Sequence, residues 1–291
     1  MAVEAYFNAE TIWVSEIDKY ACKVIDARIN KPNIGNLKII KWAEVEPVDI
    51  ITAGYPCQPF SHAGLRKGVL DERHLWPYIK QAISTIRPRI VVLENVRGHF
   101  KLGFREVLTD LTFIGYDVRW SIVRASDVGA PHRRERLFIV AEPANTDSER
   151  CPLGNDRCTT TRSQGQSQFK FTQLGKVDSD SDNQQLSSNG QMSQLGWRFN
   201  SRFEMSMRAV PNPLVNGKLN TRFVEYMMGL PVGWVTDVDI SRSQQFKILG
   251  NGVVPQQAYR ALELLCNINS FPQGLKTCGQ HAHSPLKLST I

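Results

Sequence analysis

The sequence predicts an α/β fold, in which helices cover both faces of a mostly parallel sheet and a smaller loop-rich region is attached. The first half of the chain alternates short apolar runs, typical of buried strands, with amphipathic stretches typical of helices. After Ala141 the composition shifts to Ser, Gln, Asn, Thr and Gly, and ordered patterns return near Phe223. We therefore expect a main domain over 1–143 plus 244–275, a small domain over 144–243 and a disordered tail over 276–291.

The expected elements follow one another in chain order. Strands are expected over 11–14, 49–53, 89–93 and 136–141. Helices are expected over 19–29, 75–86 and 104–113, and after Pro255, whose ring suits the first turn of a helix. Because strands alternate with helices, we expect parallel neighbours whose carboxyl ends meet at one edge of the sheet.

Composition narrows the class of protein. The net charge of +7 favours a polyanionic partner, nucleic acid first, although many basic proteins bind none. No apolar run approaches the ~18 residues of a membrane span, and the start of the chain lacks a secretory pattern. The six cysteines are far apart and contain no CxxC pair, so we expect no metal site and a reducing, cytoplasmic setting.

Cys57 follows the second expected strand and has Pro56 before it and Pro59 soon after it. The prolines stiffen this segment and hold the thiol at the carboxyl end of the strand, where ligands bind in open α/β sheets. A fixed, partly exposed thiol is typical of a reactive cysteine. From this segment alone, a structural cysteine buried before a turn explains the pattern equally well.

Glu16, Cys57 and Glu94 all come at the carboxyl ends of expected strands. Each acid alone would suit a solvated strand end, but three such residues at one edge favour a site. A thiolate beside a carboxylic acid suits covalent addition to an electron-poor ring, where the acid donates a proton or hydrogen bond as negative charge develops.

Four motifs resemble, in their order and spacing, those of the DNA cytosine-5 methyltransferases. They are Pro56-Cys57-Gln58-Pro59-Phe60-Ser61, Glu94-Asn95-Val96, Arg134-Glu135-Arg136 and Gly250-Asn251-Gly252-Val253-Val254-Pro255. The resemblance runs from about Val14 to Ala261, interrupted by the polar insert. It implies a Rossmann-like S-adenosylmethionine-dependent methyltransferase sheet, and transfer of a methyl group from that cofactor to carbon 5 of a flipped cytosine.

The resemblance implies catalytic roles for five residues. Cys57 attacks carbon 6 of cytosine and so makes carbon 5 nucleophilic. Glu94 contacts ring nitrogen 3 and the exocyclic amine, and Asn95 holds the geometry of loop and strand. Arg136 and Arg134 contact the base carbonyl, or orient Cys57 and a nearby phosphate. Without the motif, a solvated basic turn would be the alternative for these arginines.

The resemblance also implies cofactor and DNA contacts. Glu16 resembles the acid that binds the ribose hydroxyls of the cofactor. The other residues implied at the cofactor site are Ile17, Pro56, Leu75, Asn251 and Val253. The segment from Ser61 to Arg73 resembles a loop that closes over DNA and the extruded base. The residues implied at the DNA are Gln58, Ser61, Arg66 and Lys67.

The polar segment from Asn145 to Asn220 has two interpretations. Its composition alone favours a disordered insertion or linker. Its position is that of the family's target-recognition region, so we expect it to order on DNA and read base edges. On this interpretation the small domain recognises the target, and the main domain is the methyltransferase domain.

One family feature is missing from the start of the chain. Family members begin with a strand and a Phe-x-Gly-x-Gly-Gly turn around the methionine part of the cofactor, whereas residues 1–10 resemble the end of the next helix. That strand lies in the middle of the sheet, so its neighbours would expose unpaired backbone groups and apolar faces. We therefore expect an N-terminally truncated member whose sheet lacks its first strand and whose activity is uncertain.

The leading function is cytosine-5 methylation of double-stranded DNA by a monomeric, DNA-associated enzyme, with a restriction endonuclease as candidate partner and no membrane involved. One alternative is a truncated, catalytically impaired remnant that at most binds DNA. Another is an RNA cytosine-5 methyltransferase, of which the branch within this family stays open. RNA-modifying families with two catalytic cysteines are disfavoured, because no second expected strand ends in a cysteine.

Overall fold

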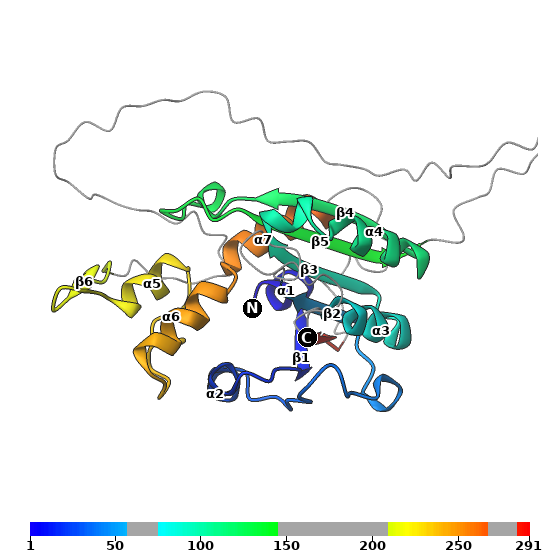
Figure 1. Ribbon diagram of the computed structural model, residues 1–291, viewed down its shortest axis with the longest axis horizontal. Coiled ribbons are helices and arrows are strands. Elements are labelled where there is room, and N and C mark those ends of the chain that lie inside the picture. The colour runs from blue at the N-terminus through cyan, green and yellow to red at the C-terminus, as the bar shows by residue number, and fades with distance from the viewer. Residues whose placement is uncertain (57–74, 145–208, 267–283) are drawn as a thin grey trace, which may run out of the picture.

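The structure is a computed structural model that describes residues 1–56, 75–144, 209–266 and 284–291. Its centre is a six-stranded sheet with the strand order β1-β8-β2-β3-β5-β4 (Figure 1). Only β5 runs against its neighbours β3 and β4. The prediction of a mostly parallel α/β sheet is confirmed. The strands are β1 (Ala9–Val14), β2 (Ile50–Gly54), β3 (Ile90–Val96), β4 (Tyr116–Val123), β5 (Arg136–Pro143) and β8 (Leu286–Thr290).

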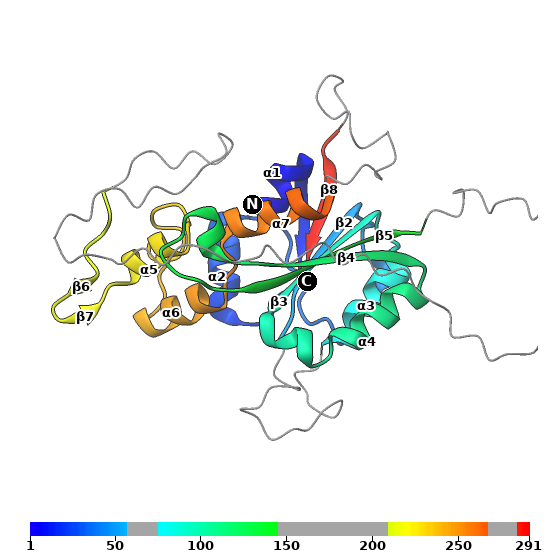
Figure 2. The same ribbon diagram turned by 90° about the horizontal axis from the view of Figure 1, so that it is seen from above.

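Helices cover both faces of this sheet. Helices α3 (Trp76–Ile86) and α4 (Phe104–Phe113) lie on one face, and α1 (Ala2–Phe7) and α7 (Pro255–Cys266) lie on the other (Figure 2). Side chains of successive strand residues point to opposite faces. Ile51 accordingly packs in the cluster under α3 and α4, whereas Ile50 packs in the cluster under α1 and α7.

The local sequence explains where several helices begin. The carboxylate of Asp18 accepts hydrogen bonds from the backbone nitrogens of Tyr20 and Ala21, at 2.9 and 3.2 Å, and so caps α2 (Lys19–Arg28). Helix α7 has Pro255 as its first residue, where the missing N–H costs nothing. Short 3-10 helices follow other elements, namely η1 (Trp42–Glu44), η4 (Arg97–Lys101) and η5 (Ala125–Val128).

A smaller region extends from the edge of the sheet beside α2 (Figure 1). It contains the hairpin of β6 (Leu214–Val215) and β7 (Lys218–Leu219), followed by α5 (Thr221–Met227) and α6 (Arg242–Asn251). Most of the polar insert, residues 145–208, lies outside the described residues. The boundaries of a target-recognition domain at 144 and 243 stay a prediction.

Strand β8 corrects two expectations. Residues 286–290 are not a disordered tail, because they form a strand between β1 and β2, parallel to both. The place in the middle of the sheet is therefore filled, and the neighbouring strands are paired. The segment is held from both faces, since Leu288 is buried in one core cluster and Ile291 in the other. A strand this short is stabilised by partners remote in sequence, and its composition gives little sign of that.

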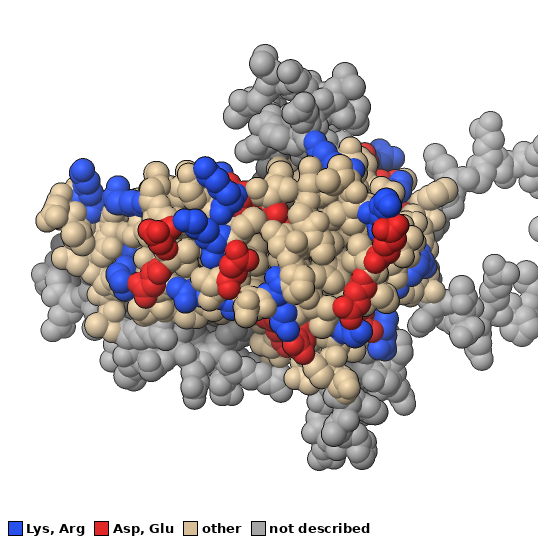
Figure 3. Space-filling model, turned by 90° about the horizontal axis from the view of Figure 1, so that it is seen from below, with Lys and Arg blue, Asp and Glu red and all other residues tan. Residues whose placement is uncertain are grey.

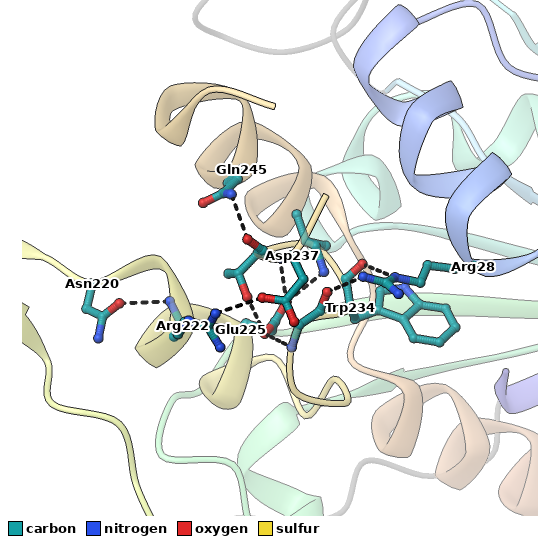
Figure 4. A network of polar contacts seen from close by, with 10 residues as sticks. Arg28, Asn220, Arg222, Glu225, Trp234, Asp237 and Gln245 are labelled. Atoms are coloured by element: carbon teal, nitrogen blue, oxygen red, sulfur yellow. Dashed lines mark hydrogen bonds and ion pairs between the residues drawn. The ribbon is translucent and has the colours of Figure 1, made fainter. Parts of the chain in front are cut away.

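A buried carboxylate fixes the loop between α5 and α6 (Figure 4). Glu225 is 2% exposed and accepts hydrogen bonds from the backbone nitrogens of Gly233, Val235 and Thr236 at 2.7, 2.7 and 3.0 Å. The Thr236 hydroxyl adds a fourth at 3.0 Å. Arg28 of α2 donates to the carbonyl oxygens of Gly233 and Trp234, at 2.5 and 2.8 Å. The loop therefore ties the smaller region to the main domain.

Glu225→Gln is expected to lower the free energy of unfolding by about 2–4 kcal/mol. The NH2 group of glutamine would face buried N–H groups that now donate to the carboxylate, and would leave them without an acceptor. Asp237→Asn is the matched control in the same loop: it breaks an exposed ion pair with Arg222, 2.7 Å long, which contributes less than about 1 kcal/mol. Urea denaturation measures both variants. Equal losses in the two would contradict a special role for Glu225.

Candidate active site

The carboxyl ends of four parallel strands meet at one edge of the sheet. Val14 at the end of β1 is the register partner of Thr290 in β8, which is also the partner of Thr52 in β2. Two residues later in β2, Gly54 is the partner of Glu94 in β3. The structure thus brings Glu16, which follows β1, to the same edge as Glu94 and as the segment that leads from β2 to Cys57.

Glu94 forms a mostly buried ion pair with Arg136. The Nε atom of Arg136 lies 2.9 Å from Oε1 of Glu94, and the two side chains are 15% and 17% exposed. The pairing follows from the antiparallel register of β3 and β5, in which Arg136 lies opposite Val96. Burial raises the pKa of Glu94 to about 7, because loss of hydration outweighs the attraction of Arg136 and Arg134. Near neutral pH this carboxyl group is able both to hold and to release a proton.

Arg134 lies beside this pair, but its hydrogen bonds go to backbone carbonyl groups. Its guanidinium group donates to the carbonyl oxygens of Gly250 and Gly252, at 2.7 and 2.6 Å. Burial, followed by the neighbouring charge of Arg136, lowers the pKa of Arg134 to about 10. These contacts join the turn before β5 to the residues around Asn251. Arg136, and not Arg134, is the arginine that contacts Glu94.

Gln257 of α7 supports the same turn and was not predicted from the sequence. Its Nε2 atom donates to the carbonyl oxygens of Val123 and Arg134, at 2.8 and 2.7 Å, and the residue is fully buried. Arg134 itself has a φ of 28°, in the left-handed region. A buried amide that holds a strained residue has no local sequence signal, because its partners come from β4 and from the turn before β5.

Asn95 and His99 hold the chain just before Cys57. The Asn95 side chain is 3% exposed, and its Nδ2 atom donates to the carbonyl oxygen of Tyr55 at 3.1 Å. The hydroxyl of Tyr55 lies 3.0 Å from Nε2 of His99. Burial lowers the pKa of His99 to about 4, so the ring is neutral at physiological pH. Neither Tyr55 nor His99 was predicted from the sequence.

The predicted nucleophile itself, Cys57, lies outside the described residues. The predicted DNA contacts lie outside them as well, namely Gln58, Ser61, Arg66 and Lys67. What the structure describes is the exposed Pro56 and the anchored Tyr55 that immediately precede Cys57.

Glu16 has one carboxylate oxygen in use and one available. Oε1 accepts hydrogen bonds from the backbone nitrogens of Ile17 and Asp18, at 2.7 and 2.8 Å. Within the described part of the chain, Oε2 has no partner. The backbone of Glu16 is fixed by Asn33, whose amide group pairs with its N–H and its carbonyl oxygen, each at 3.0 Å. The side chain of Ile17 is 70% exposed at this point. A free carboxylate oxygen beside an exposed apolar side chain fits a sugar hydroxyl and an adjoining flat ring.

For the remaining residues predicted at the cofactor site, the structure shows only their packing or their exposure. Leu75 precedes α3 and packs against the core beneath it. Asn251 is exposed at the end of α6, and Val253 packs against the cluster under α1 and α7. Their part in a cofactor site stays a prediction.

The described residues contain neither a membrane-spanning helix nor a cluster of metal ligands. No helix among them has the length and apolar character needed to cross a membrane. No group of three or more His, Cys, Asp or Glu side chains in the described ranges is placed to hold a metal ion.

The chain is similar to known proteins over most of its length. The family described as C-5 cytosine-specific DNA methylase matches residues 4–209. Type II methyltransferase M.NlaX of Neisseria lactamica is 36% identical over 143 residues, which cover 47% of this chain and 46% of that protein. Type II methyltransferase M.BsuFI of Bacillus subtilis is 34% identical over 134 residues, or 44% and 33% of the two chains. The aligned residues thus span less than half the length of these curated relatives.

Solved structures show the same fold. The Dnmt2 methyltransferase of S. pombe superposes with a TM-score of 0.57 at 16% identity, over 92% of this chain and 95% of that one. A DNMT2 mutant from Spodoptera frugiperda superposes with a TM-score of 0.54 at 18% identity, over 91% and 94%. At such low identities the likeness shows the fold alone.

Proposed function

The chain belongs to the C-5 cytosine-specific DNA methylase family, and from this premise we propose that it methylates carbon 5 of a cytosine extruded from double-stranded DNA. The observation that carries the proposal is the buried pair of Glu94 and Arg136, at a strand end beside the segment that leads to Cys57. A carboxyl group with a pKa of about 7 suits hydrogen bonding to a ring nitrogen whose charge changes during the reaction.

In the proposed reaction the thiolate of Cys57 forms a bond to carbon 6 of the base. The electron pair of the 5,6 double bond moves into the ring, and Glu94 stabilises it by donating a hydrogen bond or proton at nitrogen 3. Bound S-adenosylmethionine supplies an electrophilic methyl group. Once carbon 5 carries that group, loss of its proton to a base re-forms the double bond and expels the thiolate. Arg136 balances Glu94 whenever that carboxyl group is ionised.

The anchoring of Tyr55 supports the assignment of Cys57 as nucleophile. Its carbonyl oxygen is held by Asn95 and its hydroxyl by His99, so the chain leaves β2 in one direction. A nucleophile two residues further on starts from a fixed point, which lowers the entropic cost of placing it against the base.

Glu16 and Ile17 support S-adenosylmethionine as the cofactor. The Oε2 atom of Glu16, which has no partner among the described residues, is suited to accept hydrogen bonds from ribose hydroxyls. The exposed side chain of Ile17 offers an apolar surface to the adenine ring.

The DNA-facing surface is proposed from charge and position. Three arginines surround Glu135 near the sheet edge where the parallel strands end, which we call the active edge. They are Arg97, Arg124 and Arg133, and the latter two lie 3.1 and 3.2 Å from the Glu135 carboxylate. Basic and acidic side chains are interspersed on the face seen in Figure 3, so that face does not carry a continuous basic surface. We place the DNA at the active edge, with Gln58, Ser61, Arg66 and Lys67 and the 144–243 region completing the contact. A monomer in the cytoplasm with a restriction endonuclease as partner belongs to the same proposal.

The test is bisulfite sequencing of DNA and RNA from methylation-deficient cells that express this chain, beside a Cys57→Ser control. We expect methylated cytosines at one short DNA motif in the wild type and none in the control. Methylation confined to RNA would establish the RNA alternative. Absence of both, from protein shown to be folded, would leave a catalytically impaired member of the family.

A further inference from the structure

The turn that leads into Arg136 contains a strained residue. Arg134 has a φ of 28°, in the left-handed region that is unfavourable for residues other than glycine. Its guanidinium group donates to the carbonyl oxygens of Gly250 and Gly252, and its own carbonyl oxygen accepts a hydrogen bond from Gln257 at 2.7 Å. A strained backbone persists only where its surroundings hold it, so these contacts from α6, α7 and the link between them define the turn.

Gln257 uses both hydrogens of its amide group on the backbone. Its Nε2 atom donates to the carbonyl oxygen of Val123, the last residue of β4, at 2.8 Å and to that of Arg134 at 2.7 Å. The residue is 0% exposed, and its Oε1 atom has no partner among the described residues. Because an unpaired buried acceptor is unfavourable, the group that glutamine contributes at this position is the NH2 group, which joins β4 to the turn.

The two acceptors of Gln257 flank the backbone of Arg136. Val123 is the register partner of Arg136 across β4 and β5, and Arg134 lies two residues before it. The guanidinium group of Arg136 lies between two acceptors in turn. Its Nε atom is 2.9 Å from the carboxylate of Glu94, and its Nη1 atom donates to the carbonyl oxygen of the preceding residue at 2.9 Å. A shift of this backbone would therefore move the guanidinium group relative to Glu94, which belongs to β3.

We propose that Gln257 is a positioning residue for the proposed reaction: it holds the backbone on both sides of Arg136 and so keeps the guanidinium group against the carboxylate of Glu94. The inference rests on the proposed function. Because Gln257 is uncharged and its amide donors are used on the backbone, its effect reaches Glu94 through the position of Arg136. The proposed reaction uses Glu94 as a donor at the base, so both the orientation and the proton affinity of this carboxyl group affect the chemical step.

The charges around Glu94 give the sign of the expected change. Burial raises the pKa of Glu94 to about 7, and the attraction of Arg136, followed by that of Arg134, opposes this rise. From η4, the side chain of Arg97 pairs with Glu135. If Arg136 moves away from Glu94, less attraction opposes the effect of burial, so the pKa of Glu94 rises further.

An NMR titration of the full chain, carrying isotope-labelled glutamate, measures this pKa without the need for turnover. The signal of Glu94 is identified by its loss in Glu94→Gln. Gln257→Met keeps the length and the helix propensity of the side chain and removes the amide donors. We expect Glu94 to titrate at about pH 7 in the wild type and about one pH unit higher in Gln257→Met.

Two further variants complete the experiment. Gln256→Met is the matched control, because Gln256 is the preceding residue of α7, is 7% exposed and donates to the carbonyl oxygen of Gly229 at 2.9 Å. It also removes a buried amide donor, and it should leave the pKa of Glu94 unchanged. Gln257→His keeps a ring N–H for one of the two carbonyl groups. In this milder variant, which serves if Gln257→Met does not fold, Glu94 should titrate between the two values.

Single-turnover kinetics supply the functional readout. Gln257→Met should lower the rate of methyl transfer about tenfold, while the affinities for DNA and S-adenosylmethionine change less than about twofold. An unchanged pKa of Glu94 in both Gln257 variants, or an equal shift in Gln256→Met, would overturn the inference while the proposed function stands. A wild-type chain that methylates neither DNA nor RNA would contradict the proposed function, whereas the titration would still decide whether Gln257 positions Arg136.

Discussion

Cys57→Ala is expected to abolish covalent trapping of the protein on DNA that contains 5-fluorocytosine in the target sequence. Fluorine at carbon 5 cannot leave as a proton, so the bond between carbon 6 and the attacking sulfur persists after methyl transfer. Loss of the thiol removes that bond, and turnover of ordinary DNA should fall by more than about 10³-fold. Denaturing electrophoresis of the protein–DNA adduct measures trapping directly.

The control for this experiment is Cys278→Ala, which removes a cysteine that belongs to none of the four motifs. It should trap as the wild type does. Trapping needs methyl transfer, so the wild-type chain is first shown to turn over on unmodified DNA. An adduct that still forms with Cys57→Ala would assign the nucleophile to another residue.

The sequence predicted those parts of the fold that local patterns determine. The helix expected over 104–113 is α4 with the same bounds, because its apolar side chains repeat with helical spacing and pack against β4. The buried strands β2 and β3 were equally clear as apolar runs bounded by polar residues. The β4 strand was not predicted, since exposed, half-buried and buried residues are mixed along it.

The site was predicted as a set of residues but not as a geometry. Motifs placed Glu94 and Arg136 in the same site, yet their contact depends on the antiparallel register of β3 and β5. His99 and Gln257 act through partners distant in the chain, Tyr55 for one and Val123 for the other. Contacts of that kind form only once the sheet has formed, so the spacing of residues along the sequence does not predict them.

Strand β8 weakens the argument for the alternative that the chain is a truncated, catalytically impaired remnant. The expectation of impaired activity rested partly on a central gap in the sheet, with unpaired backbone on β1 and β2. In the structure both strands pair with β8, and Ile50 has Leu288 as its register partner. The expected gap in the sheet therefore no longer argues against activity. Calorimetric titration of the wild-type chain with S-adenosylmethionine measures the remaining quantity, which is the affinity for the cofactor.

Glu94→Gln is expected to lower methyl transfer by about 10²–10³-fold while binding of DNA and cofactor is retained. The amide keeps the size and a hydrogen-bond donor but cannot supply a proton. The charge that Glu94 stabilises arises only after attack on the base, so the loss should be seen in the rate of the chemical step. Single-turnover kinetics, with DNA affinity measured in parallel, separate the two effects. Parallel loss of affinity and rate would instead indicate a role in ground-state binding.

The same substitution has a second consequence, for stability. Burial raises the pKa of Glu94 in the folded chain from its usual 4.5 to about 7, so the unfolded chain ionises this group more readily. The wild type therefore loses unfolding free energy as the pH rises from about 5 to 7, by up to ~3 kcal/mol, and the deficit persists above that range. Glutamine cannot ionise, so the unfolding free energy of the variant does not fall with pH in this way. The variant does lose the ion pair with Arg136, which lowers its unfolding free energy by an amount that is separate from this pH effect.

Urea denaturation at intervals from pH 5 to 8 should show the unfolding free energy of the variant rising relative to that of the wild type as the pH increases. A difference that stays constant over this range would mean that Glu94 is ionised throughout, and the carboxyl group would then be a hydrogen-bond acceptor for the base and not its proton donor.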